Sequence, residues 1–222
     1  MSGIERPGPS RAVRRGVLRM AAAAGVVPVL GCGSLSNPAP RFEYFVIEDL
    51  RAGSVPPPGT PPRVERTLLM TTGPTQALYD SDRIVFTRDG DGRAYYQYSN
   101  WSERPARRIL SLTEARLARG GGFRAVAQTL AGVRGDLVMS LRLDELIHDV
   151  SRPPGTVRTT LTAELVDWRT RALAARRTFS QSAPVASADA RGAARAANDA
   201  VTALIDELTV WAEQSAAAIR AS

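Results

Sequence analysis

One cysteine and one histidine are the side chains with the widest chemical range among the 222 residues of this sequence. Cys32 is the only cysteine and His148 the only histidine, so the chain can form no internal disulfide. Together they supply too few nitrogen and sulfur ligands for a zinc centre, and no metal or other cofactor is expected. A lone thiol is either incidental or the acceptor of a covalent group. The residues before Cys32 favour the second interpretation.

An arginine-rich start and an apolar core precede the cysteine. Residues 1–19 contain five arginines and one acid, Glu5, and residues 20–31 carry no charge. A basic start, an apolar core of about a dozen residues and a small residue before the cleavage point are typical of a secretory signal. The core is too short to remain as a membrane-spanning helix, because a bilayer core is about 30 Å thick. Residues 1–31 are therefore predicted to be a signal peptide.

Residues 29–32, Val-Leu-Gly-Cys, resemble the bacterial lipobox, in which a diacylglycerol is attached to the cysteine sulfur before cleavage. Cys32 is thus the predicted lipidation site, and several acyl chains, at about 0.8 kcal/mol per buried methylene, would hold it in a membrane. Gly33 resembles the pattern sorted to the outer membrane, and residues 32–41 read as a flexible tether. Arg14-Arg15 also resembles a twin-arginine export signal, so export by the Sec pathway and export by the twin-arginine pathway both stay open.

All 29 basic residues are arginine. Removal of the predicted leader takes away five arginines and Glu5, which leaves 24 basic and 21 acidic residues and a net charge of +3. The arginines are scattered among acids, whereas nucleic-acid binding requires a clustered basic face. Composition therefore argues against a nucleic-acid partner.

The usual catalytic motifs are missing from the sequence. It has no Gly-x-Ser-x-Gly elbow, and the absence of lysine excludes a phosphate-binding P-loop. His148 lies at the acid-flanked end of a predicted strand, and we expect a solvent-exposed side chain rather than a catalytic base. A non-enzyme is predicted, with an envelope hydrolase as the remaining alternative.

The periodicity of the chain predicts one α/β domain over residues 42–220, with a mixed β-sheet, flanking helices and a long C-terminal amphipathic helix. Strands are expected at 42–47, 64–71, 82–88, 93–98, 123–127, 137–144, 157–168 and 172–182. Residues 89–92, Asp-Gly-Asp-Gly, predict a hairpin turn, with a calcium loop as the alternative. Residues 53–63, rich in proline, are expected to form a surface loop.

Two helices are expected. The first is predicted to begin after Ser102, which can cap it, and to end at residues 120–122, Gly-Gly-Gly. The second covers residues 188–220 and has an apolar stripe along one face. That stripe could pack on the sheet or lie on a membrane; its opposite face is rich in acids, which favours packing on the sheet.

The order of these features resembles the ABC-type transport auxiliary lipoproteins. The resemblance covers the lipobox, the strand at 42–47, the blocks Tyr79–Phe86 and Tyr95–Pro105, the post-helix segment Gly122–Val126 and the terminal helix. It implies a compact α/β domain on the periplasmic face of the outer membrane. Its implied partners are an MCE-domain protein and the permease and ATPase of an ABC transporter that moves lipids between membranes. Some members of the family assemble into rings, so a homo-oligomer is also possible.

The aromatic block leaves two interpretations open. Its tyrosines and tryptophan could pack the junction of sheet and helix, or the block could form a docking surface whose arginines meet acids on the partner. The candidate docking residues are Tyr79, Arg83, Tyr96, Trp101 and Arg104. A further functional class is a lipid carrier, in which the sheet and the terminal helix would enclose an acyl-sized pocket.

Overall fold

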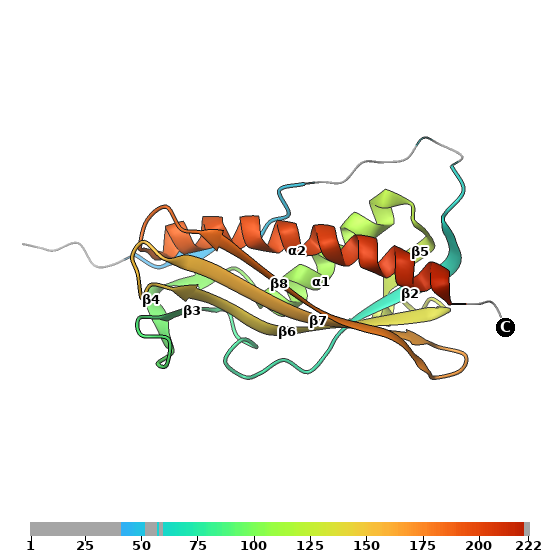
Figure 1. Ribbon diagram of the computed structural model, residues 1–222, viewed down its shortest axis with the longest axis horizontal. Helices are drawn as coiled ribbons and strands as arrows, with labels where there is room; N and C mark the ends of the chain where they lie inside the picture. The colour runs from blue at the N-terminus through green and yellow to red at the C-terminus, as the bar shows by residue number, and fades with distance from the viewer. Residues whose placement is uncertain (1–40, 52–56, 58–59, 220–222) are drawn as a thin grey trace, which may run out of the picture. The chain divides into compact units, whose positions relative to one another are not determined.

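The computed structural model describes residues 41–51, 57 and 60–219 (Figure 1). The predicted signal peptide, Cys32 and all of the predicted tether except Arg41 lie outside these residues. The described part contains eight strands, two α-helices and one short 3₁₀ helix, η1. In chain order they are β1 Glu43–Phe45, β2 Val64–Thr72, β3 Arg83–Thr87, β4 Ala94–Trp101, α1 Pro105–Gly120, β5 Phe123–Gln128, η1 Thr129–Ala131, β6 Leu137–Asp149, β7 Thr156–Asp167, β8 Leu173–Pro184 and α2 Ala190–Ala218.

Strand β6 is the centre of the sheet. One edge pairs with β7 along its whole length, and β7 pairs in turn with β8, all antiparallel. The other edge is shared by two parallel strands: β2 pairs with Leu137–Leu141 and β3 with His148–Asp149. The sheet therefore divides beside the middle of β6, with β2 and β5 at one end and β3, β4 and β1 at the other.

Alternation along β6 explains which face is covered. Leu137, Met139, Leu141 and Leu143 are buried, whereas the residues between them are partly exposed. This is the period-2 pattern of a strand with one covered face. A register shift after Leu143 then brings Leu146 and His148 onto the same face.

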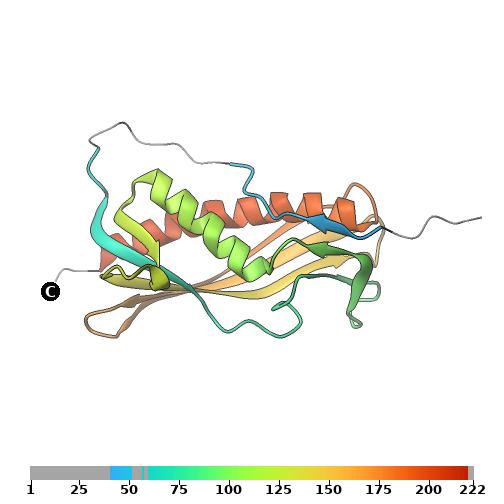
Figure 2. The same cartoon turned by 180° about the vertical axis from the view of Figure 1, so that it is seen from behind.

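Both helices cover this one face of the sheet. Figures 1 and 2, which view the domain from opposite sides, show α1 and α2 on the same side of the strands. The apolar stripe of α2 is buried and includes Val201, Leu204, Ile205 and Leu208. Trp211 packs edge-on against Phe179 of β8, with ring centroids 5.6 Å apart. Packing on the sheet is thus confirmed, and the mixed α/β fold with a long terminal helix is as predicted.

No helix within the described ranges combines the length and apolarity that crossing a bilayer requires.

The start of α1 differs from the prediction. Its N-cap is Arg104 with Pro105 in the first turn, and no side chain caps it. The predicted cap Ser102 instead donates its backbone N–H to the carbonyl of Phe45 at 2.8 Å, which ties β1 to the end of β4. The helix ends as predicted, with Gly121 in the left-handed region at φ 62°.

Residues 89–92 form the predicted hairpin turn between β3 and β4. Asp89 Oδ1 accepts hydrogen bonds from the backbone N–H groups of Asp91 and Gly92 at 3.0 and 2.8 Å. These bonds hold the pKa of Asp89 below its ordinary value. The carboxylate therefore organises its own turn, and the segment of chain described here contains no cluster of acids, histidine and cysteine suited to a metal ion.

Candidate functional site

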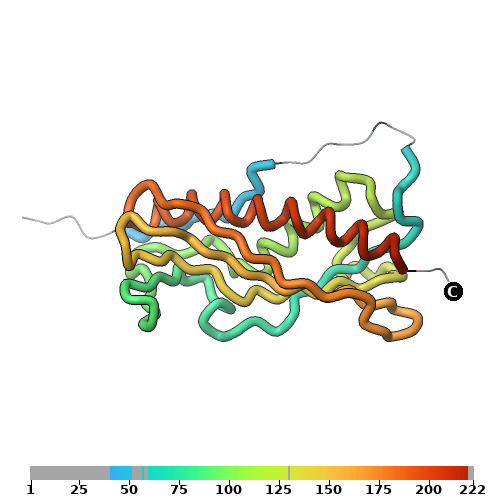
Figure 3. The backbone as a smooth tube through the Cα atoms, in the orientation of Figure 1, coloured from blue at the N-terminus to red at the C-terminus, as the bar shows by residue number. Residues whose placement is uncertain are grey.

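The first described residues form an extended arm, residues 41–51, that runs from the predicted tether onto the two helices. Figure 3 shows its trace beside the N-terminal half of α2. The arm runs parallel to α2, because partner numbers rise along both segments: Glu43 pairs with Arg191, the N–H of Glu48 bonds Asn198, and the N–H of Leu50 bonds Thr202. From α1, Arg108 Nε donates to the carbonyl of Ile47 at 2.8 Å. Ile47 itself is 2% exposed and belongs to the hydrophobic core, so it holds the arm against the domain.

A buried cluster of charged side chains holds the C-terminal end of the arm. Arg116 of α1 binds both carboxylate oxygens of Asp49, and its other nitrogen lies 2.5 Å from Asp206 of α2. The side chains of Arg116 and Asp49 are only 10% and 4% exposed. Burial alone would lower the pKa of Arg116, but its bonds to Asp49 and Asp206 outweigh that effect and raise it. The cluster joins the arm and both helices by charged, bidentate contacts.

Sequence reasoning missed this cluster, although α1 holds one signal for it. Arg116 is seven residues after Ile109 and next to Leu117, and all three are buried. Since seven residues are about two helical turns, Arg116 lies on the apolar face of α1. A buried arginine needs a carboxylate partner, but nothing local in the sequence points to Asp49, which is 67 positions away.

His148 is buried, and the expectation of a solvent-exposed side chain was wrong. It is 1% exposed because the register shift in β6 turns it toward the helices. Both ring nitrogens are engaged: Nδ1 lies 2.8 Å from the hydroxyl of Tyr96, and Nε2 lies 2.9 Å from the carbonyl of Pro154. Because that carbonyl can only accept, Nε2 carries the hydrogen and Nδ1 accepts from Tyr96.

Burial sets the ionisation of this pair. It lowers the pKa of His148, and the bond to Pro154 and the charges of Asp149 and Asp189 do not compensate. Burial, together with the charge of Asp189, raises the pKa of Tyr96 to about 12. Both groups are therefore neutral near pH 7, and neither nitrogen of His148 is available to activate a serine.

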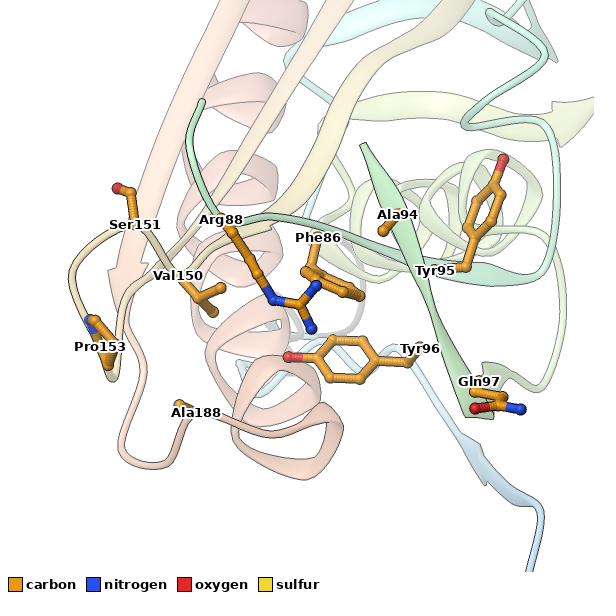
Figure 4. Close-up of a pocket in the computed structure, with 10 residues that line it drawn as sticks. All are labelled: Phe86, Arg88, Ala94, Tyr95, Tyr96, Gln97, Val150, Ser151, Pro153 and Ala188. Atoms are coloured by element: carbon orange, nitrogen blue, oxygen red, sulfur yellow. The ribbon is translucent and has the colours of Figure 1, made fainter. Parts of the chain in front are cut away.

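A surface cavity of about 720 Å³ lies beside the pair (Figure 4). Its wall includes Phe86, Arg88 and Tyr96, with Val150 and Pro153 from the β6–β7 turn. Arg88 stacks its guanidinium on the ring of Phe86 at 4.8 Å from the centroid. The cavity has both polar and apolar walls and is open to solvent at the end of the sheet.

The space between the sheet and α2, by contrast, is filled with side chains. The cavity there measures only about 10 Å³, and its lining includes Trp101, Leu146 and Ala197. That volume is at the lower limit for one water molecule. Within the described residues, the acyl-sized pocket that a carrier would need at this place is absent.

The five candidate docking residues divide into two groups. Tyr79 and Trp101 are 7% and 3% exposed and belong to the core, and Tyr96 is half-buried against His148. Arg83 and Arg104 are exposed: Arg83 stacks on the ring of Tyr95, and Arg104 pairs with Asp80 at 3.4 Å. The three aromatic residues thus pack β4 and the segment before β3 onto the core, whereas the two arginines are exposed to solvent.

The chain belongs to the ABC-type transport auxiliary lipoprotein component family. The sequence profile of that family matches residues 53–209, which is more than half of the chain. The resemblance drawn from the sequence is therefore confirmed, and the chain is of the class of lipoproteins that assist ABC-type transport. A search among curated proteins gave no match.

Solved structures share the fold. A protein of Xanthomonas campestris assigned to family DUF330 has a TM-score of 0.67 and 21% identity, and the match covers 78% of this chain and 96% of that one. A structure described as an uncharacterized protein has a TM-score of 0.56 and 10% identity, with coverage of 76% and 98%. A hypothetical protein of Chlamydia trachomatis follows at 0.50 and 8%, with coverage of 70% and 99%.

Proposed function

We propose that this protein is a non-catalytic auxiliary component of an ABC and MCE-type system that moves phospholipids between membranes. It would be anchored through Cys32 to the periplasmic face of the outer membrane and would contact the MCE-domain protein or the transporter. Family membership supports the transport role. Both ring nitrogens of His148 are within hydrogen-bond distance of a partner, which argues against the hydrolase. The space between the sheet and α2 is filled with side chains, which argues against the lipid carrier.

The single observation that carries the proposal is the attachment of the arm. The arm is the described segment nearest to Cys32, and it is fixed to α1 and α2 through Ile47 and the bonds of Asp49 to Arg116. A force applied at a lipidated cysteine would therefore reach the helices and the sheet directly, because Ile47 and Asp49 hold the arm to the helices and β1 pairs with β4. This construction suits a domain that is held in place rather than one that diffuses.

Arg104 is the proposed partner contact. Its guanidinium pairs with Asp80, but both side chains are exposed, at 63% and 47%. Such pairs contribute about 0–1 kcal/mol, so Arg104 can exchange Asp80 for a carboxylate on the partner at little cost. Whether the anchored protein also assembles into a homo-oligomer remains a prediction.

The experiment is Cys32→Ser in the full chain. We expect the variant to lose its acyl groups, leave the outer-membrane fraction and fail to restore lipid transport in a deletion strain. Its unfolding midpoint should match that of the wild type, because the first described strand begins only at Glu43. A variant that stays in the outer membrane and restores transport would overturn the proposal.

Arg104→Glu separates docking from anchoring. This variant should remain in the outer membrane and unfold normally, but it should lose co-purification with the MCE-domain protein. Arg176→Glu is the matched control, since Arg176 has a similarly exposed pair with Glu164 on the sheet. Equal co-purification of both variants would exclude Arg104 as the contact.

A further inference from the structure

Exposed apolar side chains gather where the tether meets the domain. Ten large hydrophobic side chains are exposed among the described residues, and six of them lie on the arm or on β4. These six are Phe42, Tyr44, Val46, Leu50, Tyr95 and Tyr98. Apolar residues scattered singly over a protein surface are normal, but such scatter does not account for six on two neighbouring segments.

Four of these aromatic rings form one face, which we call the aromatic patch: Phe42, Tyr44, Tyr95 and Tyr98. Tyr44 is opposite Asn100 in the register of β1 and β4, and Asn100 is opposite Arg83 of β3. Since directly opposed residues point to the same side of a sheet, Tyr44 and Arg83 share a face.

Two ring contacts complete the patch. Phe42, two positions before Tyr44, packs edge-on against Tyr98 with centroids 5.7 Å apart. Arg83 stacks over Tyr95 at 4.8 Å from its centroid. The patch is therefore a contiguous surface, and its tyrosines are 38–64% exposed.

The position of the patch identifies its occupant. The described chain begins at Arg41, one residue before Phe42, and Cys32 is ten residues upstream of Phe42. Ten residues span at most about 33–36 Å, so an anchor at Cys32 would keep the patch within that distance of the bilayer. Tyrosine and other aromatic rings are enriched at the membrane–water interface, where one side is apolar and the other wet.

We infer that the aromatic patch rests on the lipid surface, so that the anchored domain has a fixed orientation. Phe42 and Tyr98 insert their rings among the lipid headgroups, and Arg83 donates to a lipid phosphate. This inference depends on the lipid anchor proposed above, and it adds a second, non-covalent contact with the same membrane.

Local charge predicts which lipids are needed. Glu43 and Asp80 are paired with Arg191 and Arg104, and Asp82 lies beside Arg83 in sequence. The patch therefore carries little net charge, and the contact depends on the rings and on short-range bonds to phosphate. It should form on zwitterionic phosphatidylethanolamine and phosphatidylcholine vesicles and change little with salt.

The test uses the lipidated full-length product, reconstituted in such vesicles. With the sulfur of Cys32 acylated, Asn100→Cys adds the only free thiol, at the position that the strand register places opposite both Tyr44 and Arg83. Val210→Cys is the matched control, because Val210 is 55% exposed on α2 and outside the patch. Each thiol carries a polarity-sensitive dye, and nitroxide-labelled lipid serves as the quencher.

We expect at least a twofold greater quenching at position 100 than at position 210. The double variant Tyr44→Ser with Tyr98→Ser should abolish this difference while the protein still floats with vesicles. Equal quenching at both positions, with flotation retained, would overturn the inference and leave the anchor intact. A dye at position 100 that is shielded from water but not quenched by the labelled lipid would also overturn the inference, because a protein would then cover the patch. Loss of flotation in the parent protein would instead reject the anchor itself.

Discussion

Arg116 of α1 binds both oxygens of Asp49, a residue of the arm 67 positions earlier in the sequence. The pair joins the described segment nearest to the proposed anchor to the helical layer, and Asp206 of α2 shares the same guanidinium. Since the pair is almost inaccessible to water, removal of one partner leaves a buried charge without compensation. The arm therefore depends on this contact more than on any of its exposed ones.

Arg116→Met is expected to lower the free energy of unfolding by about 3–5 kcal/mol, as measured by urea denaturation. Arg176→Met removes an exposed pair with Glu164 and should cost less than about 1 kcal/mol. The arm should also become sensitive to protease before the rest of the domain unfolds. Equal, small losses in the two variants would contradict a structural role for the cluster.

Tyr96→Phe tests the hydrogen bond to His148. The variant keeps the ring but leaves the buried Nδ1 of His148 without a donor, which should cost about 1–3 kcal/mol of unfolding free energy. Tyr95→Phe removes the hydroxyl of the exposed neighbour and should change stability by less than about 0.5 kcal/mol. If the two variants are equally stable, the bond contributes nothing.

The lowered pKa of His148 implies a loss of stability at mildly acidic pH. Its pKa in the folded protein is below the ordinary value of about 6.5, so the unfolded chain binds more protons in that range. The contribution is complete above pH 6.5 and declines as the pH falls below it. Urea midpoints of the wild type should therefore decline between about pH 6.5 and about pH 5 relative to those of His148→Gln, which has no such titration. Parallel curves for the two proteins would reject this assignment.

Asp149 acts in a separate, more acidic range. Hydrogen bonds from Ser151, followed in effect by Arg158, lower its pKa to about 2. A carboxylate with a lowered pKa stabilises the fold above its unfolded value of about 3.8 and loses that effect as the pH falls toward 2. Asp149→Asn should thus lower the stability of the fold at neutral pH and have little effect near pH 2, as followed by acid unfolding. A constant difference at every pH would contradict the prediction.

Gly155 lies in the β6–β7 turn at φ 96°, and a Cβ there would meet the carbonyl oxygen of Asp149 at 2.2 Å. Gly155→Ala is expected to cost more than about 2 kcal/mol, because the clash adds to the strain of the left-handed backbone. Gly132→Ala, at φ 69° with open space around it, isolates the backbone term and should cost about 1 kcal/mol. The order of the two thermal midpoints tests this, and a reversed order would contradict it.

Periodic segments made most of the fold predictable from sequence. The alternation of Leu137 to Leu143 indicated a strand with one covered face, the acidic opposite face of α2 favoured packing on the sheet, and the Asp-Gly pairs favoured the hairpin. Ser102 was wrongly predicted as the N-cap of α1 because serine is a common capping residue. In the structure its backbone N–H instead donates to the carbonyl of Phe45. The division of the sheet beside β6 had no local signal, since it arises from which strands meet in space.

The candidate site was predictable only in part. The block from Tyr79 to Arg104 was recognised, but sequence could not tell which members face water; the fold buries Tyr79 and Trp101 and exposes Arg83 and Arg104. His148 was misjudged because one register shift in β6 reversed the face on which it lies. Arm contacts such as Asp49 with Arg116 join distant parts of the chain and depend on the complete fold.

The most direct test of the account is the intact mass of the protein extracted from outer membranes. We expect a polypeptide that begins at Cys32 and is heavier than residues 32–222 by its attached acyl chains. A full-length, unmodified chain recovered from the soluble fraction would contradict it.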